Sequence, residues 1–409
     1  MSRKPAGDNV QSRDQLLERA SRLTVLLLCG GRATRLRPLS SPDQPKSMVP
    51  YLGRPLVDYL LDLMADNGLS DVVLSSGHES FVSHLSRSAY CETMRIRYNE
   101  PQGPWRGTAS CALEVVSALG KDVSDPYLVV YGDSLLHADL AAMAAFHLSR
   151  KADATILYHR PDFGAFLYEP VDEPPPDRPR TNYGVMDCNP DGLVTRFVEK
   201  PYVDEIGELF RDPCANAAAY VVARDALERV GQSALGDFAC HVFPAMVEGG
   251  MSVLGFGIGT GYREDVGTLD RYLRLHMLAL EGEIDIPHLR SASASRVWIG
   301  DDATVSPDAT LVPPVVVGRR SVVAPGARLE RCYLGEDVQV GDGAIISSSV
   351  VHSNASIGAG AHIRCSVLAS HATVETEVGL PAGTVVGPYA VFGDRRLSSL
   401  GGGYGQART

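Results

Sequence analysis

Several features are absent from the sequence, and each absence excludes a class of protein. The 409-residue chain has no apolar run of the ~18 residues that a membrane-spanning helix needs. Basic residues are not in excess, since 38 Lys and Arg stand against 49 Asp and Glu for a net charge of -11, which argues against non-specific nucleic-acid binding. The eight cysteines include no CxxC pair, so we expect reduced thiols rather than disulfides or a zinc site. The first 22 residues have no apolar core of a secretory signal, and we expect a cytoplasmic location.

The two commonest phosphate-binding loops are also missing. No GxGxxG fingerprint occurs, and Lys46–Ser47 follows Pro45 where a GxxxxGK[ST] loop requires glycine. The chain has instead an apolar run, residues 23–29 (LTVLLLC), followed at once by GGRATRLRPLSSPDQPKSMVP, residues 30–50. A continuous apolar run is typical of a parallel strand buried on both faces, and glycines at its end let backbone N–H groups approach an anion. Four cations follow within fifteen residues, namely Arg32, Arg35, Arg37 and Lys46.

Residues 30–38 and 45–50 resemble the signature of sugar-1-phosphate nucleotidyltransferases, which is GGxGTRLxP and, after a short gap, PKxMxP. One departure is Ala33, where the family usually has glycine. Because alanine disfavours positive φ, we expect a negative φ at Ala33 or a slightly shifted triphosphate. The alternative interpretation of the segment is an incidental basic turn after a strand. The resemblance implies transfer of a nucleotidyl group from a nucleoside triphosphate to a sugar 1-phosphate, with release of pyrophosphate.

Strand and helix patterns alternate after the first 22 residues. The elements expected are strands at 23–29, 71–76 and 127–134, and helices at 54–68 and 108–120 that end at glycine. This order predicts an α/β fold, namely a Rossmann-like, mostly parallel sheet with helices on both faces. Ligands of such sheets bind beyond the carboxyl ends of the strands, where Gly30, Gly31 and Asp133 lie. Proline and acidic residues at 168–183 predict a surface loop, either a solvated insertion or a flap near the active site.

The C-terminal third has a six-residue repeat. Apolar residues recur every six positions with an occasional five-residue step, so that Leu334, Val351 and Leu368 are 17 residues apart. Glycine often follows the apolar position, as at Gly300 and Gly318. Such a repeat predicts a parallel β-helix with three faces to each coil, in which every coil buries its face only against its neighbours. The pattern resembles the left-handed hexapeptide-repeat helix.

These patterns predict five parts of the chain. They are an N-terminal arm or short helix at 1–22, a nucleotidyltransferase domain at 23–280, a linker at 281–296, a left-handed parallel β-helix at 297–393 and a flexible tail at 394–409.

The resemblance implies four catalytic residues. In the family reaction a sugar phosphate oxygen attacks the α-phosphorus in line, so the protein must neutralise charge and hold two phosphates together, and it needs no covalent nucleophile. Arg35 is expected to hold the β- and γ-phosphates with its planar fork, and Lys46 to contact the α-phosphate or the attacking phosphate. The alternative for both is an exposed surface cation. Asp133 in YGDS, and Asp265 in a segment similar to WxDIGTPxxY, are expected to bind Mg²⁺.

Both aspartates have alternatives. Asp133 could be a helix N-cap or turn residue, and Glu264 could replace Asp265 as the metal ligand.

The nucleotide is expected to contact residues from two segments. Leu28, Gly30, Gly31 and Arg32 follow or end the first strand. RGTAS (106–110) resembles the family's LGTA loop, which implies that Gly107, Thr108 and Ala109 line the base. Trp105 is an addition, either packed as a hydrophobic anchor or stacked on the base or a neighbouring subunit.

The sugar phosphate is expected to contact four residues. FVEKP (197–201) implies that Glu199 contacts sugar hydroxyls and that Lys200 binds the sugar phosphate. Gly184 lies in NYGVMD where the backbone approaches the sugar. Asn216 lies in NAAAY, which resembles the family's NAGIY but has Ala218 in place of glycine. Asn216 as a mere turn residue is the alternative.

Three functional alternatives remain open. The favoured activity is guanylyl transfer from GTP to a sugar or cyclitol 1-phosphate, with adenylyl or thymidylyl transfer as variants. A second is a bifunctional enzyme whose β-helix is an acyltransferase with His352, His362 or His371 as general base, residues expected on coil exteriors. A third is a non-catalytic regulatory subunit. The β-helix is expected to mediate self-association into a homodimer or homotetramer, with no nucleic-acid or membrane partner.

Overall fold

The computed structural model describes residues 12–30, 34–100, 102, 106–160, 178–231, 236–286, 289 and 295–393. The chain divides into two compact units. The sheet unit comprises Met1–Gly30 and Tyr59–Arg263, and the β-helix unit comprises Gly31–Asp58 and Glu264–Thr409. The second unit therefore contains most of the nucleotidyltransferase-like signature as well as the C-terminal repeats. The predicted boundaries at 23, 280 and 297 stay predictions.

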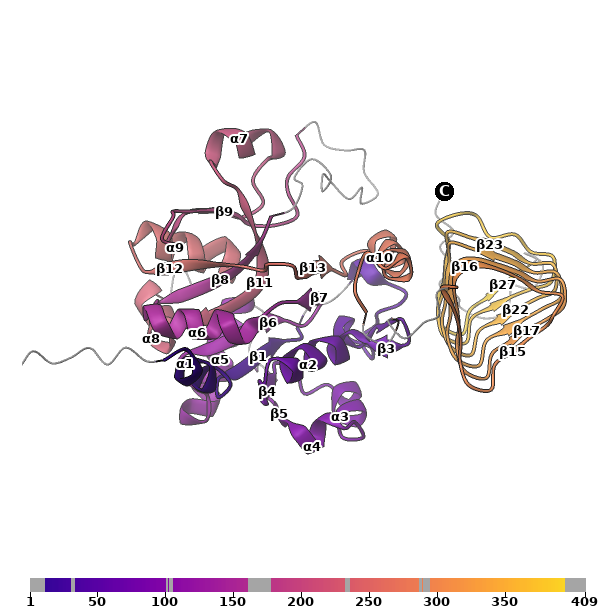
Figure 1. Ribbon diagram of the computed structural model, residues 1–409, viewed down its shortest axis with the longest axis horizontal. Coiled ribbons are helices and arrows are strands. Elements are labelled where there is room, and N and C mark those ends of the chain that lie inside the picture. The colour runs from indigo at the N-terminus through magenta and orange to yellow at the C-terminus, as the bar shows by residue number, and fades with distance from the viewer. Residues whose placement is uncertain are drawn as a thin grey trace, which may run out of the picture. The chain divides into compact units, whose positions relative to one another are not determined.

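The sheet unit is built on a nine-stranded mixed sheet with the order β10-β9-β11-β6-β1-β4-β5, to which β8 is joined through β11 and β12 through β8 (Figure 1). Its parallel half contains the three strands that the sequence pattern predicts, at β1, β4 and β6, together with β5, which the pattern does not predict. The four strands are β1 (Thr24–Leu28), β4 (Asp71–Leu74), β5 (Arg95–Tyr98) and β6 (Tyr127–Tyr131). All five residues of β1 are buried, as expected for a strand covered on both faces.

The other half of the sheet is centred on β11 (Cys214–Val222), which reverses the strand direction. β11 runs antiparallel to β6, to β8 (Ala154–His159) and to β9 (Val185–Cys188). β10 (Val194–Val198) is antiparallel to β9, and β12 (Val253–Gly257) is parallel to β8. The predicted α/β fold is confirmed, and the mixed character comes from strands beyond the region where strand and helix patterns alternate.

Two helices end at the glycines that the sequence indicates. Gly68 has φ +67° after α2 (Leu56–Asp66), and Gly120 caps α5 (Thr108–Leu119). The other helices before residue 260 are α1 (Arg13–Ala20), α3 (Glu79–Leu85), α4 (Tyr90–Thr93), α6 (Leu140–Arg150), α7 (Ile206–Leu209), α8 (Arg224–Val230) and α9 (Phe243–Glu248). The core includes the rings of Tyr220, Phe238 and Phe243, whose centroids lie 4.7–5.6 Å apart.

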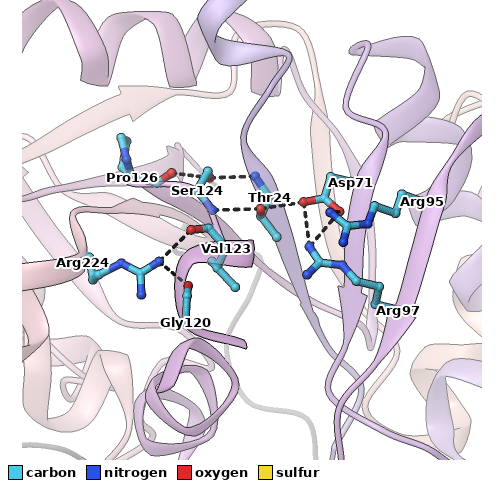
Figure 2. A network of polar contacts seen from close by, with 9 residues as sticks. All are labelled: Thr24, Asp71, Arg95, Arg97, Gly120, Val123, Ser124, Pro126 and Arg224. Atoms are coloured by element: carbon cyan, nitrogen blue, oxygen red, sulfur yellow. Dashed lines mark hydrogen bonds and ion pairs between the residues drawn. The ribbon is translucent and has the colours of Figure 1, made fainter. Parts of the chain in front are cut away.

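A polar network closes the amino-terminal edge of the parallel strands (Figure 2). The Thr24 N–H donates to Ser124 Oγ at 2.8 Å, and the Ser124 N–H donates to Thr24 Oγ1 at 3.0 Å. The Thr24 hydroxyl donates to Asp71, whose carboxylate also accepts from Arg97 at 2.7 Å. Arg224 donates to two carbonyls of the turn after α5. Because this edge is opposite the carboxyl ends of the strands, the network stabilises the sheet and leaves the ligand-binding edge to other residues.

The C-terminal repeats form a parallel β-helix (Figure 1). Its strands are β14 (Val297–Ile299), β15 (Thr304–Val305), β16 (Thr310–Val317), β17 (Val322–Val323), β18 (Arg328–Leu334), β19 (Gln339–Val340), β20 (Ile345–Ser347), β21 (Val350–Val351), β22 (Ser356–Ile357), β23 (His362–Arg364), β24 (Val367–Leu368), β25 (Thr373–Val374), β26 (Val385–Val386) and β27 (Val391–Phe392). Leu334 pairs with Val351 and Val351 with Leu368, so the period of 17 in the sequence is the register between coils. All three side chains are buried in one continuous core.

The coils turn at recurring positions with positive φ. Arg320, Asp337, Asn354 and His371 occupy one such corner, with φ between 55° and 63°. Gly318 precedes the corner, and a Cβ atom built there would clash with the backbone of the next coil. Glycine after the apolar position is therefore required by the close approach of coils.

The remaining elements hold the signature segment and its partner helix. They are η1 (Thr34–Leu36), η2 (Lys46–Met48), β2 (Pro50–Tyr51), β3 (Arg54–Pro55) and α10 (Leu269–Glu281). β2 and β3 form a hairpin with a two-residue turn, Leu52–Gly53. Both turn residues have positive φ, and this turn geometry matches the twist of paired strands best. β7 (Ser134–His137) pairs with β13 (Tyr262–Asp265). No described helix is both long and apolar enough to cross a membrane.

Candidate active site

The end of β1 lies beside the turn that carries Asp133. The Leu28 carbonyl accepts a hydrogen bond from the Gly132 N–H at 2.9 Å. The next residue, Cys29, donates its N–H to the Ser75 hydroxyl at 3.0 Å. Leu28, Gly30 and Asp133 therefore share the carboxyl edge of the parallel strands, where α/β sheets bind ligands. Gly31 and Arg32, together with Ala33, Trp105, residues 168–177 of the acidic loop and the tail 394–409, lie outside the described residues.

In the β-helix unit, Lys46 forms an ion pair with Asp265. Lys46 Nζ lies 3.1 Å from Asp265 Oδ1, and the two side chains are only 13% and 27% exposed. A Cβ atom built at Gly267 would lie 2.8 Å from Asp265 Oδ2 and 3.8 Å from Arg35 Nη2. The structure thus brings together three of the four residues predicted to be catalytic. Two cations at one place supply charge that suits a polyphosphate.

Glu264, the alternative to Asp265, is bound elsewhere. Its carboxylate lies 2.9 Å from Arg271 Nη2, and Arg271 is largely buried on α10. Truncating one partner of such a pair leaves a buried charge without compensation. Glu264 therefore fixes the start of α10, and Asp265 is the carboxylate beside the two cations.

The RGTAS turn is held from within the sheet unit. Gly107 has φ +126°, and a Cβ atom built there would clash with the backbone of Gly236 and Asp237. The Gly236 carbonyl accepts hydrogen bonds from the N–H groups of Ala109 and Ser110 at 3.1 and 3.2 Å. The Gly236–Asp237 backbone thus covers the first turn of α5. The sequence motif gives no sign of this partner segment.

The Thr108 hydroxyl belongs to a chain of buried and partly buried hydrogen bonds. Asn216 Nδ2 donates to the Tyr220 hydroxyl at 2.9 Å, and Tyr220 is hydrogen-bonded to Tyr131. The Tyr131 hydroxyl donates to Thr108 Oγ1 at 2.8 Å, and the Thr108 hydroxyl donates to Asp237 Oδ2 at 2.8 Å. Burial raises the pKa of both tyrosines, so they stay protonated as donors. The chain connects Asn216, predicted to bind sugar, with Thr108, predicted to bind nucleotide.

Sequence reasoning missed three of the five residues in this chain of hydrogen bonds. Tyr131 lies two residues before Asp133, and Tyr220 ends NAAAY, so both stand in segments that the motifs had marked. Asp237 stands in no such segment. Only the fold shows that these three side chains belong to one chain of hydrogen bonds.

Glu199 is buried against Gly184. A Cβ atom built at Gly184 would lie 2.6 Å from Glu199 Oε2 and 2.7 Å from the Phe197 ring, so glycine is needed there. Among the described residues, no hydrogen-bond donor reaches Glu199 Oε2, which is buried. Burial raises the pKa of Glu199 to about 7, against the opposing charges of Lys200 and Arg263. A buried acceptor without a partner is what a site for ligand hydroxyls requires.

Two further residues of the sheet unit have positive φ. Lys200 has φ +48°, and its carbonyl accepts a hydrogen bond from Arg180 Nη1 at 3.0 Å. The Arg180 guanidinium lies 3.8 Å from the centre of the Tyr202 ring. Ala218 has φ +56°, and its N–H donates to Asn216 Oδ1 at 2.9 Å. Positive φ in non-glycine residues persists where the surroundings impose it, which is common at functional sites.

The carboxylates predicted to bind metal have suitable chemistry for magnesium. Mg²⁺ takes oxygen ligands and is usually bound through one or two protein carboxylates together with substrate phosphates. Asp133 follows the end of β6, and Asp265 Oδ1 lies 3.1 Å from Lys46 Nζ, a cation that can also bind phosphate. Among the described residues, no group of three or more His, Cys, Asp or Glu side chains forms an all-protein metal cage. Two carboxylates are a donor set of the kind that Mg²⁺ accepts.

Comparison with known proteins agrees with this geometry. The family model described as "Nucleotidyl transferase" matches residues 24–282, and that described as "GMPPB C-terminal domain" matches residues 293–393. The chain belongs to the nucleotidyl transferase family. This confirms the resemblance seen in the signature segment, and the protein is a nucleotidyltransferase.

Several curated nucleotidyltransferases are similar over most of their length. A mannose-1-phosphate guanylyltransferase of Mycobacterium tuberculosis is 31% identical over 331 residues, covering 79% of this chain and 82% of the relative. A mannose-1-phosphate guanyltransferase of Schizosaccharomyces pombe is 28% identical, covering 80% and 85%. A UTP–glucose-1-phosphate uridylyltransferase of Synechocystis is 22% identical, covering 80% and 87%.

Proposed function

We propose that this enzyme transfers a guanylyl group from GTP to mannose 1-phosphate or a closely related sugar or cyclitol 1-phosphate, releasing pyrophosphate. The observation that carries the proposal is the Lys46–Asp265 pair with Arg35 beside it, within a chain whose relatives are named guanylyltransferases. All reactants are anions, so catalysis depends on charge neutralisation and positioning.

The cations are assigned to the phosphates. Lys46 contacts the α-phosphate or the attacking phosphate once substrate replaces Asp265 as its partner. Arg35 holds the β- and γ-phosphates through its planar fork and stabilises the charge on departing pyrophosphate. Because Lys46 is only 13% exposed, its charge is weakly screened by water and acts strongly on a bound phosphate.

The carboxylates are assigned to a magnesium ion. Asp133 and Asp265 would hold it, and when bound it would neutralise phosphate charge and favour attack at the α-phosphorus. Leu28, Gly30, Gly31, Arg32, Gly107, Thr108 and Ala109 are assigned to the nucleotide.

The sugar phosphate is assigned to four residues of the sheet unit. Glu199 accepts hydrogen bonds from sugar hydroxyls, which would satisfy its buried oxygen. Gly184 leaves the space beside it, Asn216 supplies a further amide, and Lys200 binds the phosphate. The Asn216 amide already holds Ala218 and Tyr220, so it also fixes the backbone there.

The alternatives from the sequence are less favoured. His352, one acyltransferase candidate, is 5% exposed and bonded to Tyr272 rather than lying on a coil exterior as expected. The regulatory-subunit interpretation is disfavoured because Arg35, Lys46, Asp133, Lys200 and Asp265 are all present. A uridylyltransferase among the relatives keeps UTP as the second nucleotide to test. Self-association through the β-helix into a dimer or tetramer is part of the proposal.

The test is pyrophosphate release with Mg²⁺, each nucleoside triphosphate and a panel of sugar 1-phosphates. We expect the fastest release with GTP and mannose 1-phosphate. Asp133→Asn should abolish turnover while leaving the thermal unfolding temperature unchanged. Release with another pair alone would reassign the substrate, and retained activity in Asp133→Asn would remove that residue from the metal assignment.

A further inference from the structure

The hairpin that follows Lys46 is fastened to α10. The Tyr51 hydroxyl donates to the Leu275 carbonyl at 2.7 Å, and the Leu52 N–H donates to His276 Nε2 at 3.2 Å. Since Nε2 of His276 accepts, its Nδ1 carries the proton and donates to the Tyr272 carbonyl at 2.9 Å. The hairpin therefore rests on a fully buried, neutral histidine.

The same hairpin is also fastened to the β-helix through one hydroxyl. Tyr272, fully buried on α10, donates its hydroxyl proton to the Pro50 carbonyl. His352 Nε2 lies 2.9 Å from the same hydroxyl oxygen. Because that hydroxyl has only one proton, His352 must donate its Nε2–H to it. A bridge of hydrogen bonds thus connects His352 of the β-helix through Tyr272 to Pro50.

The hairpin tip touches the β-helix as well. A Cβ atom built at Gly53 would lie 2.6 Å from the Tyr333 hydroxyl, and the Tyr333 ring lies 6.0 Å from that of His276. The tip therefore has no room to shift toward β18. Together with the bridge from His352, this contact holds the hairpin both at Pro50 and at its tip.

Lys46 is only four residues before Pro50. Between them, the Met48 N–H donates to the Pro45 carbonyl and the Val49 N–H to the Lys46 carbonyl, at 2.8 and 3.0 Å. A displacement of Pro50 is therefore passed to Lys46 through a tight 3₁₀ turn. Asp265, the partner of Lys46, ends β13 four residues before the start of α10, so the other end of the ion pair is close in sequence to the helix that carries Tyr272.

We propose that Tyr272 and His352 are positioning residues that hold Lys46 against Asp265 through the Pro50 carbonyl, so that the β-helix sets the geometry of the catalytic lysine. This inference rests on the proposed role of Lys46. It gives the β-helix a direct part in turnover, in addition to any part in assembly.

The experiment compares variants of the full-length chain. Tyr272→Phe removes only the shared hydroxyl, His352→Leu removes the donor at similar volume, and His352→Gln keeps an N–H at the place of Nε2. The control, Ser321→Ala, removes a buried hydroxyl that donates to the Gly335 carbonyl at 2.8 Å inside the β-helix. Each variant is measured for kcat, KM, thermal unfolding and amide hydrogen exchange of residues 46–55.

We expect Tyr272→Phe and His352→Leu to lower kcat roughly ten- to hundredfold, since small displacements of catalytic groups are costly, with little change in KM. Exchange at 46–55 should quicken in both, His352→Gln should restore most of kcat, and Ser321→Ala should change neither kcat nor that exchange.

Unchanged kcat and exchange in Tyr272→Phe and His352→Leu would overturn the inference, as would a Ser321→Ala effect of equal size. If one of these two variants fails to fold, amide hydrogen exchange of residues 46–55 in the other variant decides whether the inference holds. An inactive wild-type chain with any substrate pair would instead count against the proposed function, while the exchange measurements would still test the bridge.

Discussion

Lys46 Nζ lies 3.1 Å from Asp265 Oδ1 although 219 residues separate the two in the chain. In the absence of substrate the acid neutralises the lysine, and a phosphate group can take its place. The Asp265 carboxylate therefore compensates the charge of the largely buried Lys46 ammonium group. In the proposed reaction, the same carboxylate would be available to a metal ion once the lysine contacts phosphate.

Glu199→Gln should make the free enzyme more stable at alkaline pH. The pKa of Glu199 is raised to about 7 by burial, so its contribution to stability is present below the unfolded pKa of 4.5 and is lost as the pH rises through 7. The advantage of the variant should therefore grow by roughly 2 to 3 kcal/mol between pH 5 and pH 8. Urea unfolding of both proteins at the two pH values measures it. A constant difference would contradict the burial of an unpaired carboxylate.

Tyr131→Phe should destabilise the sheet unit by about 1 to 3 kcal/mol, because it leaves Thr108 and Tyr220 each short of a buried partner. The matched control lies four residues earlier in β6. The Tyr127 hydroxyl is buried, and none of the described residues forms a hydrogen bond with it, so Tyr127→Phe should be neutral or stabilising. The free energy of unfolding of both variants is measured by chemical denaturation. Equal losses in Tyr131→Phe and Tyr127→Phe would show that the hydrogen bonds of Tyr131 contribute nothing specific to stability.

Ala218→Gly should stabilise the protein by roughly 0.5 to 1 kcal/mol, since a left-handed conformation costs alanine more than the added freedom of glycine in the unfolded chain. Ala217→Gly, at a buried extended position of the same strand, should destabilise it. Thermal unfolding of the two variants measures the contrast. Destabilisation of similar size in both would mean that Ala218 is not strained.

Acid should weaken the β-helix unit through two buried histidines. Burial lowers the pKa of His276 to about 3 and that of His352 to about 4. Both stay neutral in the folded state while the unfolded chain takes up protons below 6.5, so each should cost about 2 kcal/mol of stability by pH 5.

The pH dependence of unfolding tests this account. His352→Gln should reduce the loss of stability between pH 7.5 and pH 5 by about 2 kcal/mol. His371→Gln, at an exposed corner stacked on Tyr389, should leave that loss unchanged. If His352→Gln and the wild type lose the same stability between pH 7.5 and pH 5, the neutral state assigned to His352 is contradicted.

The sequence predicts the parts of this fold that depend on periodicity or on strand ends. The period of 17 is the coil register because each coil packs on the next. Leu28 is bonded to Gly132, next to Asp133, because parallel neighbours end at one edge. Antiparallel β11 was not foreseen, because a buried strand pattern carries no direction. Contacts such as Tyr272 with Pro50 and His352 depend on residues 80 to 222 positions apart, and no local pattern encodes them.

The most direct test of the central claim is the product balance of the wild-type chain supplied with Mg²⁺, GTP and mannose 1-phosphate. We predict one pyrophosphate and one GDP-sugar for each GTP consumed, with loss of both products in Lys46→Ala and Asp265→Asn. Pyrophosphate formed at the wild-type rate in those two variants, or no product with any nucleotide and sugar 1-phosphate, would contradict the account.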